Sequence, residues 1–201
     1  MTSLHERVER WHEYNKISKA GEIARRAFAN NSFDGILTMI GVVMGNFFVG
    51  VDDPTVVLVT GLSTALAIGI SGGWGAYLTE SAERRHAVGE LEQFTLTNLQ
   101  NTKIGRASRM AVLTVAAVDG LSPFLSALIV ILPFFLAPLL HSTTYAYYAS
   151  MIMALISLFG LGIYLGNISK ERMIYSGIKT TVAGMVCIGL SYLLELMSRS
   201  L

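Results

Sequence analysis

The hydrophobic and polar positions of this chain form long apolar runs joined by polar links. A transmembrane helix needs about 20 predominantly apolar residues to cross a hydrocarbon core of about 30 Å, and the runs approach or exceed that length. They cover about residues 33–50, 55–79, 110–138, 144–168 and 173–197. The pattern predicts an all-α integral membrane protein with five transmembrane helices per protomer.

Residues 1–32 are polar and charged, with apolar side chains recurring at roughly helical spacing. Such a segment is typical of an amphipathic helix lying in the membrane interface, with Trp11 and Tyr14 at the depth of the headgroups. We therefore expect a cytoplasmic or interfacial arm over residues 1–32 and a five-helix domain over residues 33–201. The polar link 80–109 is helix-prone at its start, so we expect the second membrane helix to continue beyond the bilayer.

Positive charges predict the orientation of these helices. Lys and Arg are concentrated in the arm, in the link 80–109 and at Lys170 and Arg172, and the other two links hold none. The positive-inside rule then places the N-terminus in the cytoplasm and the C-terminus outside. We expect a multi-pass protein of the cell membrane of a prokaryote.

Composition agrees with this picture and excludes several classes of protein. The 201 residues are 52% hydrophobic and 14% charged, with a mean hydropathy of +0.52, whereas ordinary soluble domains carry about 25% charged residues. No basic stretch with interleaved aromatic residues points to nucleic acid. No Ser-His-Asp order, phosphate loop or cofactor motif points to a conventional enzyme, so we expect neither catalysis nor a permanently bound cofactor.

Two acidic residues stand within the apolar runs, each followed by glycine. Asp34 lies eight residues after Arg26, and Asp119 lies ten residues after Arg109. A helix would carry both about 12–15 Å beyond the last cytoplasmic charge. An ionisable group at such depth costs at least about 2.5–3.5 kcal/mol and usually faces a polar cavity, an ion path or a partner. Asp34 is open to a second interpretation, as the N-cap of the first span.

Pro123 affects the chemistry of Asp119. A proline has no N–H to donate to the carbonyl four residues earlier, and that carbonyl belongs to Asp119. With Gly120 allowing close approach, this stretch offers a carboxylate and a backbone oxygen, which suit a hard or borderline divalent cation. The alternative is that Asp119 hydrogen-bonds a kinked helix in its protonated form.

Glycines recur at the spacing that lets membrane helices pack closely. The pairs Gly41 and Gly45, Gly69 and Gly73, and Gly162 and Gly166 each form a G-x-x-x-G motif. The alternative is that glycine is simply frequent in membrane helices. The stretch "GISGGWGAY" adds four glycines within seven residues, which favours a tight helix crossing or a ligand that touches the backbone.

Glutamates and histidines recur in the segments predicted to be cytoplasmic. They include two E-x-x-H pairs, and within each pair the Glu and the His would lie on the same face of a helix. When helices that carry such pairs pack together, the pairs build carboxylate-bridged di-metal sites. The alternative is a solvated charged face with ion pairs. The candidate residues are Glu9 and His12 in the arm, and Glu80, Glu83, His86 and Glu90 in the link.

Together these features resemble the vacuolar iron transporter family. The likeness rests on "SFDGILTMIGVVMG" in the first span, "GLSTALAIGISGGWGAYLTESAER" in the second, "SALIVILPFF" in the third, "LFGLGIYLGNISK" in the fourth and "SGIKTTVAGMVCIGLSYLL" in the fifth. It covers roughly residues 30–195.

The resemblance implies a homodimer of five-helix protomers that moves Fe²⁺, and often Mn²⁺, out of the cytosol in exchange for protons. It implies an ion path along the dimer interface near the first two spans, with Asp34 as an intramembrane metal ligand and Glu83 and Glu90 near a cytoplasmic acidic helix. Two residues depart from the family, because Thr64 and Gly72 stand where it carries a Glu and a Met. The family's three-helix cytoplasmic domain is also reduced to a short link.

The leading hypothesis is a divalent metal transporter working by proton antiport, in which Asp34 and Asp119 bind metal or protons. The Glu and His residues of the arm and link would gather metal at the cytoplasmic mouth. Its partners would be the lipid bilayer, divalent metal ions, protons and a second copy of the chain. The alternatives are a membrane-anchored ferritin-like metal binder or ferroxidase, using the E-x-x-H pairs, and a non-transporting scaffold.

Overall fold

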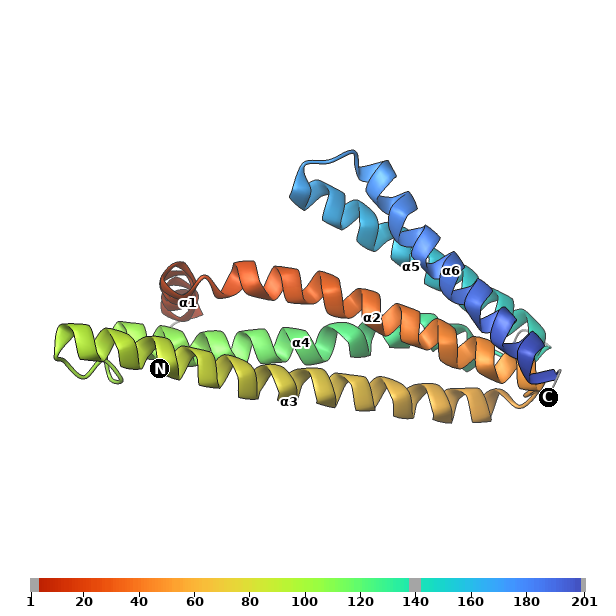
Figure 1. Cartoon of the computed structure of the whole chain (residues 1–201), viewed down its shortest axis with the longest axis horizontal. Helices are drawn as coiled ribbons and strands as arrows, with labels where there is room; N and C mark the ends of the chain where they lie inside the picture. The colour runs from red at the N-terminus through yellow and green to blue at the C-terminus, as the bar shows by residue number, and fades with distance from the viewer. Residues whose placement is uncertain (1–3, 138–141, 200–201) are drawn as a thin grey trace. The chain divides into compact units, whose positions relative to one another are not determined.

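Six helices make up the structure, which is a computed structural model describing residues 4–137 and 142–199 (Figure 1). Five of them, α2 to α6, are long and apolar enough to cross a membrane. Within the described residues the fold is all-helical, which confirms the predicted all-α class and the predicted number of helices suited to span a membrane. Pro138 and the first three residues of the arm lie outside the described residues. The helices are α1 (Leu4–Ser18), α2 (Ala20–Val49), α3 (Pro54–Thr95), α4 (Lys103–Phe135), α5 (Thr143–Ser169) and α6 (Met173–Arg199).

The first membrane helix begins earlier than its apolar run. Helix α1 ends at Ser18, because the next residue, Lys19, has a left-handed φ of 53°. Helix α2 starts at Ala20. The side chain of Asn15 accepts from the Gly21 N–H at 2.6 Å, and the Ser18 hydroxyl accepts from the Ala20 N–H at 3.4 Å. These two side chains satisfy donors that a new helix leaves without partners. Asp34 therefore lies in the middle of α2, and its interpretation as an N-cap is wrong.

Helix α3 is longer than a bilayer is thick. Its 42 residues extend about 63 Å, roughly twice the hydrocarbon core. The charged residues lie in its C-terminal half, so this half continues beyond the apolar span, as the sequence predicts. A short link over residues 96–102 then leads into α4, and the Glu92 carboxylate accepts from the Leu99 N–H at 2.7 Å within this turn.

Contacts group the helices into two units, each described by itself. Unit 1 consists of the described residues up to Phe28 together with Ile70–Leu121. In it the C-terminal part of α3 and the start of α4 form a helical hairpin, to which α1 is attached. The Arg84 guanidinium donates to the Ser18 carbonyl at 3.3 Å, and Lys103 pairs with Glu13 at 2.5 Å.

Unit 2 consists of Ala29–Gly69 and Ser122–Leu201 and contains the main hydrophobic core. Fully buried side chains from α2, α3, α4 and α5 fill it, among them Met39, Val57, Phe134 and Leu158. The buried Ser150 hydroxyl donates to the Val130 carbonyl at 2.7 Å. The Tyr147 hydroxyl donates to the Val51 carbonyl at 2.8 Å.

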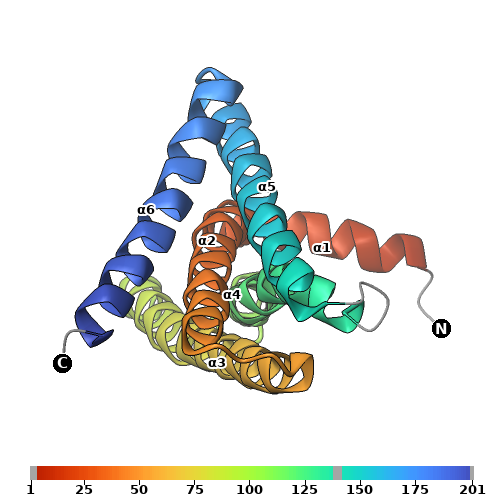
Figure 2. The same ribbon diagram turned by 90° about the vertical axis from the view of Figure 1, so that its right-hand side faces the viewer.

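Helices α5 and α6 lie side by side (Figure 2), and glycines set their separation. A side chain at Gly162 would meet the Gly177 Cα at 2.6 Å, and one at Gly166 would meet the Met173 Cα at 2.9 Å. The packing interpretation of this G-x-x-x-G motif is therefore confirmed. By contrast, a side chain at Gly41 or Gly45 would meet no described atom within 4 Å, so that motif packs against nothing within the described chain.

Candidate functional site

One exposed stripe of α2 differs from an ordinary lipid-facing surface. It consists of five residues spaced four, four, three and four positions apart, which is the period of a single helix face. We call it the α2 seam, and its members are Asn30, Asp34, Thr38, Gly41 and Gly45. Every member is exposed and is either polar or glycine.

The exposed faces of α5 and α6 in unit 2 look different. Their exposed residues are large and apolar, such as Ile152 and Ile156 on α5 and Val186 and Leu190 on α6. Between Ala29 and Phe48, α2 exposes no large hydrophobic side chain. Because lipid-facing positions are normally apolar and intramembrane polar residues face protein or water, the α2 seam has the character of a surface covered by protein or lining a polar path.

The glycine after Asp34 is the packing residue of the first Asp–Gly pair. Gly35 is buried, and a side chain there would meet the Pro123 Cα at 2.7 Å and the Ser126 hydroxyl at 2.5 Å on α4. Asp34 itself is exposed. The tight contact of Gly35 with α4 therefore fixes how α2 is positioned and rotated at Asp34, the preceding residue. It leaves the Asp34 carboxylate on the α2 seam.

The second Asp–Gly pair lies at the closest approach of α3 and α4 within unit 1. A side chain at Gly72 would lie 2.7 Å from the Asp119 carbonyl oxygen, and one at Gly73 would lie 3.4 Å from the Gly120 Cα. This carbonyl is the one to which Pro123 has no N–H to donate. The glycine run of α3 therefore serves a tight helix crossing, one of its two predicted purposes. The Asp119 side chain is half-buried at this crossing.

Gly72 is also the position at which the family resemblance expects a methionine. The structure supplies a steric reason for the difference, since the backbone of α4 occupies the space that a side chain would need. Asp119 thus stands across from the position where a thioether is missing.

Thr64, where the resemblance expects a glutamate, is half-buried, and its hydroxyl donates to the Thr60 carbonyl at 2.8 Å. Thr60 in turn accepts from the Asn46 side-chain amide at 3.3 Å. Asn46 and Thr60 form a polar contact between α2 and α3 in unit 2, and the sequence interpretation did not single out either of them. The sequence feature that could have identified them is a polar residue within each of the first two apolar runs.

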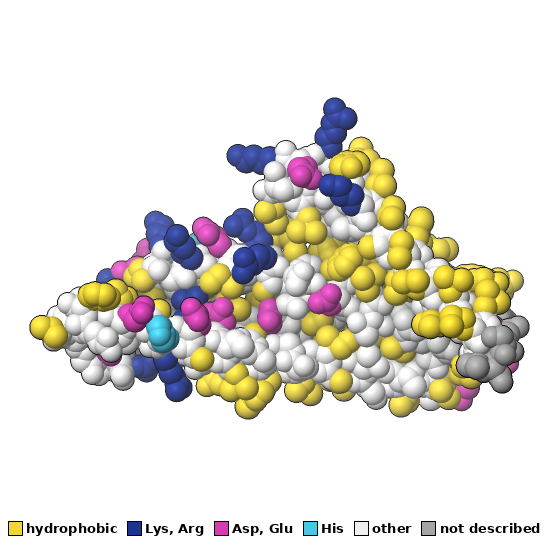
Figure 3. Space-filling view, viewed as in Figure 1, with side chains coloured by type: hydrophobic (Ala, Val, Ile, Leu, Met, Phe, Trp, Pro, Cys, Tyr) yellow, Lys and Arg dark blue, Asp and Glu magenta, His cyan; other side chains and the backbone are white. Residues whose placement is uncertain are grey.

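The candidate Glu and His residues of α3 differ in exposure. Glu83, His86 and Glu90 are exposed, at the spacing of one face, and Figure 3 shows acidic side chains near a histidine over this half of α3. Glu80 is half-buried and pairs with Arg84 at 3.0 Å. The exposed residues form an acidic stripe along α3, while Glu80 already has a cationic partner.

The arm residues Glu9 and His12 are exposed on α1, where the His12 ring packs edge-on against Trp11. Among the residues that the structure describes, no group of three or more His, Cys, Asp or Glu side chains could hold a metal ion. The described protomer therefore does not bring the two E-x-x-H pairs together into one metal centre.

Comparison with known proteins gives two matches. The sequence model of the VIT family matches residues 26–103 and 93–195, and the two segments overlap at the link between α3 and α4. The chain is also 29% identical over 178 residues to the uncharacterized protein MJ0645 of Methanocaldococcus jannaschii, covering 87% of this chain and 90% of the relative.

Proposed function

Because the chain belongs to the VIT family, whose members transport metal ions across membranes, we propose that it moves Fe²⁺ or Mn²⁺ out of the cytosol in exchange for protons. The single observation that carries the proposal is the α2 seam. It holds a carboxylate, Asp34, on a membrane helix that exposes no large apolar side chain between Ala29 and Phe48. Polar surface of this kind within a span marks an ion path or a protein partner.

The same seam supports a homodimer. Gly41 and Gly45 have open space around them in the described chain, and a G-x-x-x-G pair lets two helix backbones approach closely. Two copies joined along α2 would cover these glycines and face their Asp34 carboxylates toward a shared path. We therefore propose that the ion path runs along the interface of two protomers.

In this mechanism Asp34 and Asp119 alternate between proton and cation. A carboxylate binds either a proton or a cation, so a protonated carboxylate must lose its proton when it binds the metal, and protonation of the carboxylate weakens its hold on the metal. Asp119 would act within unit 1, where its carbonyl oxygen lies opposite Gly72, the position that lacks the expected thioether. Asp119 would then supply an oxygen ligand in place of the lost sulfur.

We further propose that the arm and the polar half of α3 face the cytoplasm, in keeping with their Lys and Arg content. There the acidic stripe of Glu83, His86 and Glu90 would raise the local concentration of divalent cations. Glu9 and His12 would contribute from α1. Glu80 would contribute only by exchanging Arg84 for a metal.

The ferritin-like alternative receives less support. Di-metal oxidation needs two metals held about 3.5–4 Å apart by converging side chains. The described residues of one protomer contain no such group. Transport therefore remains the better proposal, and it needs no catalytic centre.

The function is tested with purified protein in liposomes that enclose a pH-sensitive dye and a metal-sensitive dye. Addition of Fe²⁺ or Mn²⁺ should produce metal entry coupled to proton movement in the opposite direction. Asp34→Asn and Asp119→Asn should each abolish the coupled flux, since an amide cannot exchange a proton for a cation. Asp52→Asn, which removes an exposed acid outside the helices, should leave it unchanged. Wild-type flux in both variants would refute the assigned roles.

The dimer is tested by cross-linking. The chain has one cysteine, Cys187, so a Cys187→Ser background carries no competing thiol. Thr38→Cys on the α2 seam should then form an intermolecular disulfide in membranes. Leu190→Cys, on the exposed apolar face of α6, should not. Equal cross-linking of the two variants would mean that α2 is not the interface.

A further inference from the structure

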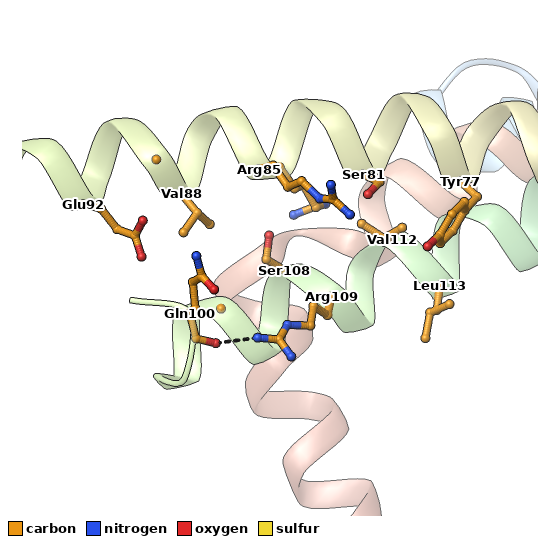
Figure 4. Close-up of a pocket in the computed structure, with 13 residues that line it drawn as sticks. Tyr77, Ser81, Arg85, Val88, Glu92, Gln100, Ser108, Arg109, Val112 and Leu113 are labelled. Atoms are coloured by element: carbon orange, nitrogen blue, oxygen red, sulfur yellow. Dashed lines mark hydrogen bonds between the residues drawn. The ribbon is translucent and has the colours of Figure 1, made fainter. Parts of the chain in front are cut away.

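A basic pocket lies within unit 1, between the polar parts of α3 and α4 (Figure 4). Its volume is about 690 Å³, within the range of sites for small organic ligands and much larger than a single small ion requires. Three arginines and one glutamate supply its charges: Arg84, Arg85, Arg109 and Glu92. A pocket with this excess of positive charge repels divalent cations, so it lies off the metal path.

Two of the three guanidinium groups are available to a ligand. Arg84 is committed to Glu80 and to the Ser18 carbonyl. In the part of the chain that the structure describes, neither Arg85 nor Arg109 forms an ion pair. Arg109 donates to the carbonyl of Gln100 at 2.9 Å, which leaves other N–H groups of its guanidinium.

Hydroxyl groups complete the polar lining. Figure 4 shows the Arg85 guanidinium between the two helices, with Ser81 on α3 and Ser108 on α4 close to it. The Tyr77 ring lines the same pocket further along α3. Guanidinium forks and hydroxyl donors are the groups that bind phosphate oxygens.

The pocket lies where the membrane span of each helix ends. On α3, the exposed Trp74 and Tyr77 rings lie 6.0 Å apart, and exposed Trp and Tyr mark the membrane–water interface. On α4, the apolar run begins just after Arg109, and Leu113, which lines the pocket, is 63% exposed. One end of the pocket is therefore apolar and at lipid depth. Arg84 and Arg85 lie about two turns from Tyr77 along α3, and Arg109 lies about one turn before Leu113 on α4.

We propose that this pocket binds the phosphate group of an anionic phospholipid. The phosphate would contact Arg85, Arg109 and the two serine hydroxyls, and the acyl chains would leave past Leu113 and Tyr77. Basic pockets between membrane helices at this depth bind lipid headgroups. The bound lipid would join the α3–α4 hairpin to the membrane surface and would neutralise positive charge beside the acidic stripe of α3. The proposal does not depend on which metal is transported.

The test titrates the purified full-length protein with phosphatidylglycerol or phosphatidylcholine and counts bound lipids by native mass spectrometry. Phosphatidylglycerol should bind the wild type and phosphatidylcholine should not. Arg85→Gln should weaken binding roughly tenfold, the loss expected for a hydrogen bond to a charged group. Arg106→Gln removes an exposed charge from the same helix, one turn before Arg109 and outside the pocket lining, and should leave binding within about twofold of wild type, as a surface charge does.

A second variant, Arg109→Gln, should match Arg85→Gln, and thermal unfolding should show that all three variants fold. Equal weakening by Arg106→Gln and Arg85→Gln, or equal binding of the two lipids, would overturn the proposal. Inorganic phosphate in large excess distinguishes the source of the phosphate group. If it leaves the bound phosphatidylglycerol in place, the lipid is the ligand. If it displaces the lipid and binds with the same dependence on Arg85, a soluble phosphate is the ligand and the lipid assignment is wrong.

Discussion

The crossing of α3 and α4 at Gly72 makes a quantitative prediction. Gly72→Ala places a methyl group 2.7 Å from the Asp119 carbonyl oxygen, whereas ordinary contact begins at 3.4 Å. The obstacle is backbone, so no rotamer change relieves it, and the helices must separate locally by the difference of about 0.7 Å. Overpacking costs about 1–3 kcal/mol, while replacing a helical glycine by alanine regains about 0.5–1 kcal/mol. We expect a net loss of about 1–2 kcal/mol in the free energy of unfolding.

Gly75 provides a matched control three residues along the same helix. A side chain there meets no described atom within 4 Å, so Gly75→Ala should be neutral or stabilise the protein by up to about 1 kcal/mol. Reversible unfolding in mixed micelles measures both variants. Equal stability of the two would refute the tight crossing. Gly72→Met, which introduces the thioether expected from the family resemblance, should be less stable than Gly72→Ala.

Three further predictions concern other contacts. Gly162→Ala should destabilise the α5–α6 pair by about 1–3 kcal/mol, whereas Gly160→Ala, with open space around it, should not; unfolding midpoints compare them, and equal values would contradict the close packing. Ser150→Ala removes the hydrogen bond to Val130 and should lower the free energy of unfolding by about 1 kcal/mol, whereas Ser157→Ala removes only a bond within its own helix and should lower it less. The reverse order would show that the Ser150 bond adds nothing to stability. Arg84→Gln should speed amide hydrogen exchange in α1 roughly tenfold through loss of the bond to Ser18, and Arg85→Gln should not; unchanged exchange in both would mean that Arg84 does not hold α1.

The spans were predictable because an apolar run of about 20 residues has few other uses. The ends of the helices were not predictable, because hydropathy identifies the residues that suit the bilayer and not the full extent of a helix. Residues 20–32 are polar, yet they contain no proline and continue α2 without a break. The end of α1 depends on side chains of Asn15 and Ser18 that accept from the next helix, and hydropathy carries no trace of such bonds.

The candidate site was predictable in its residue types but not in its neighbours. The contact of Gly72 with Asp119 joins residues 47 positions apart in the sequence, and no local pattern encodes it. Likewise, the E-x-x-H spacing puts Glu83 and His86 on one helix face without saying which way that face turns. Arg85 lies two residues after Glu83, about 200° around the helix. Arg85 therefore turns toward α4, while Glu83 and Glu90 face outward.

The link between α3 and α4 offers an opening for protein engineering. Phe94 at the end of α3 and Leu96 in the link are 87% and 92% exposed. The backbone of the link is bonded within the hairpin tip, and Arg109 on α4 also donates to the Gln100 carbonyl. Exposed loop tips of this kind tolerate inserted domains. A fluorescent protein spliced between Thr97 and Asn98 would therefore leave the glycine crossing of α3 and α4 untouched. It would provide an optical reporter for following insertion and trafficking of the protein in living cells.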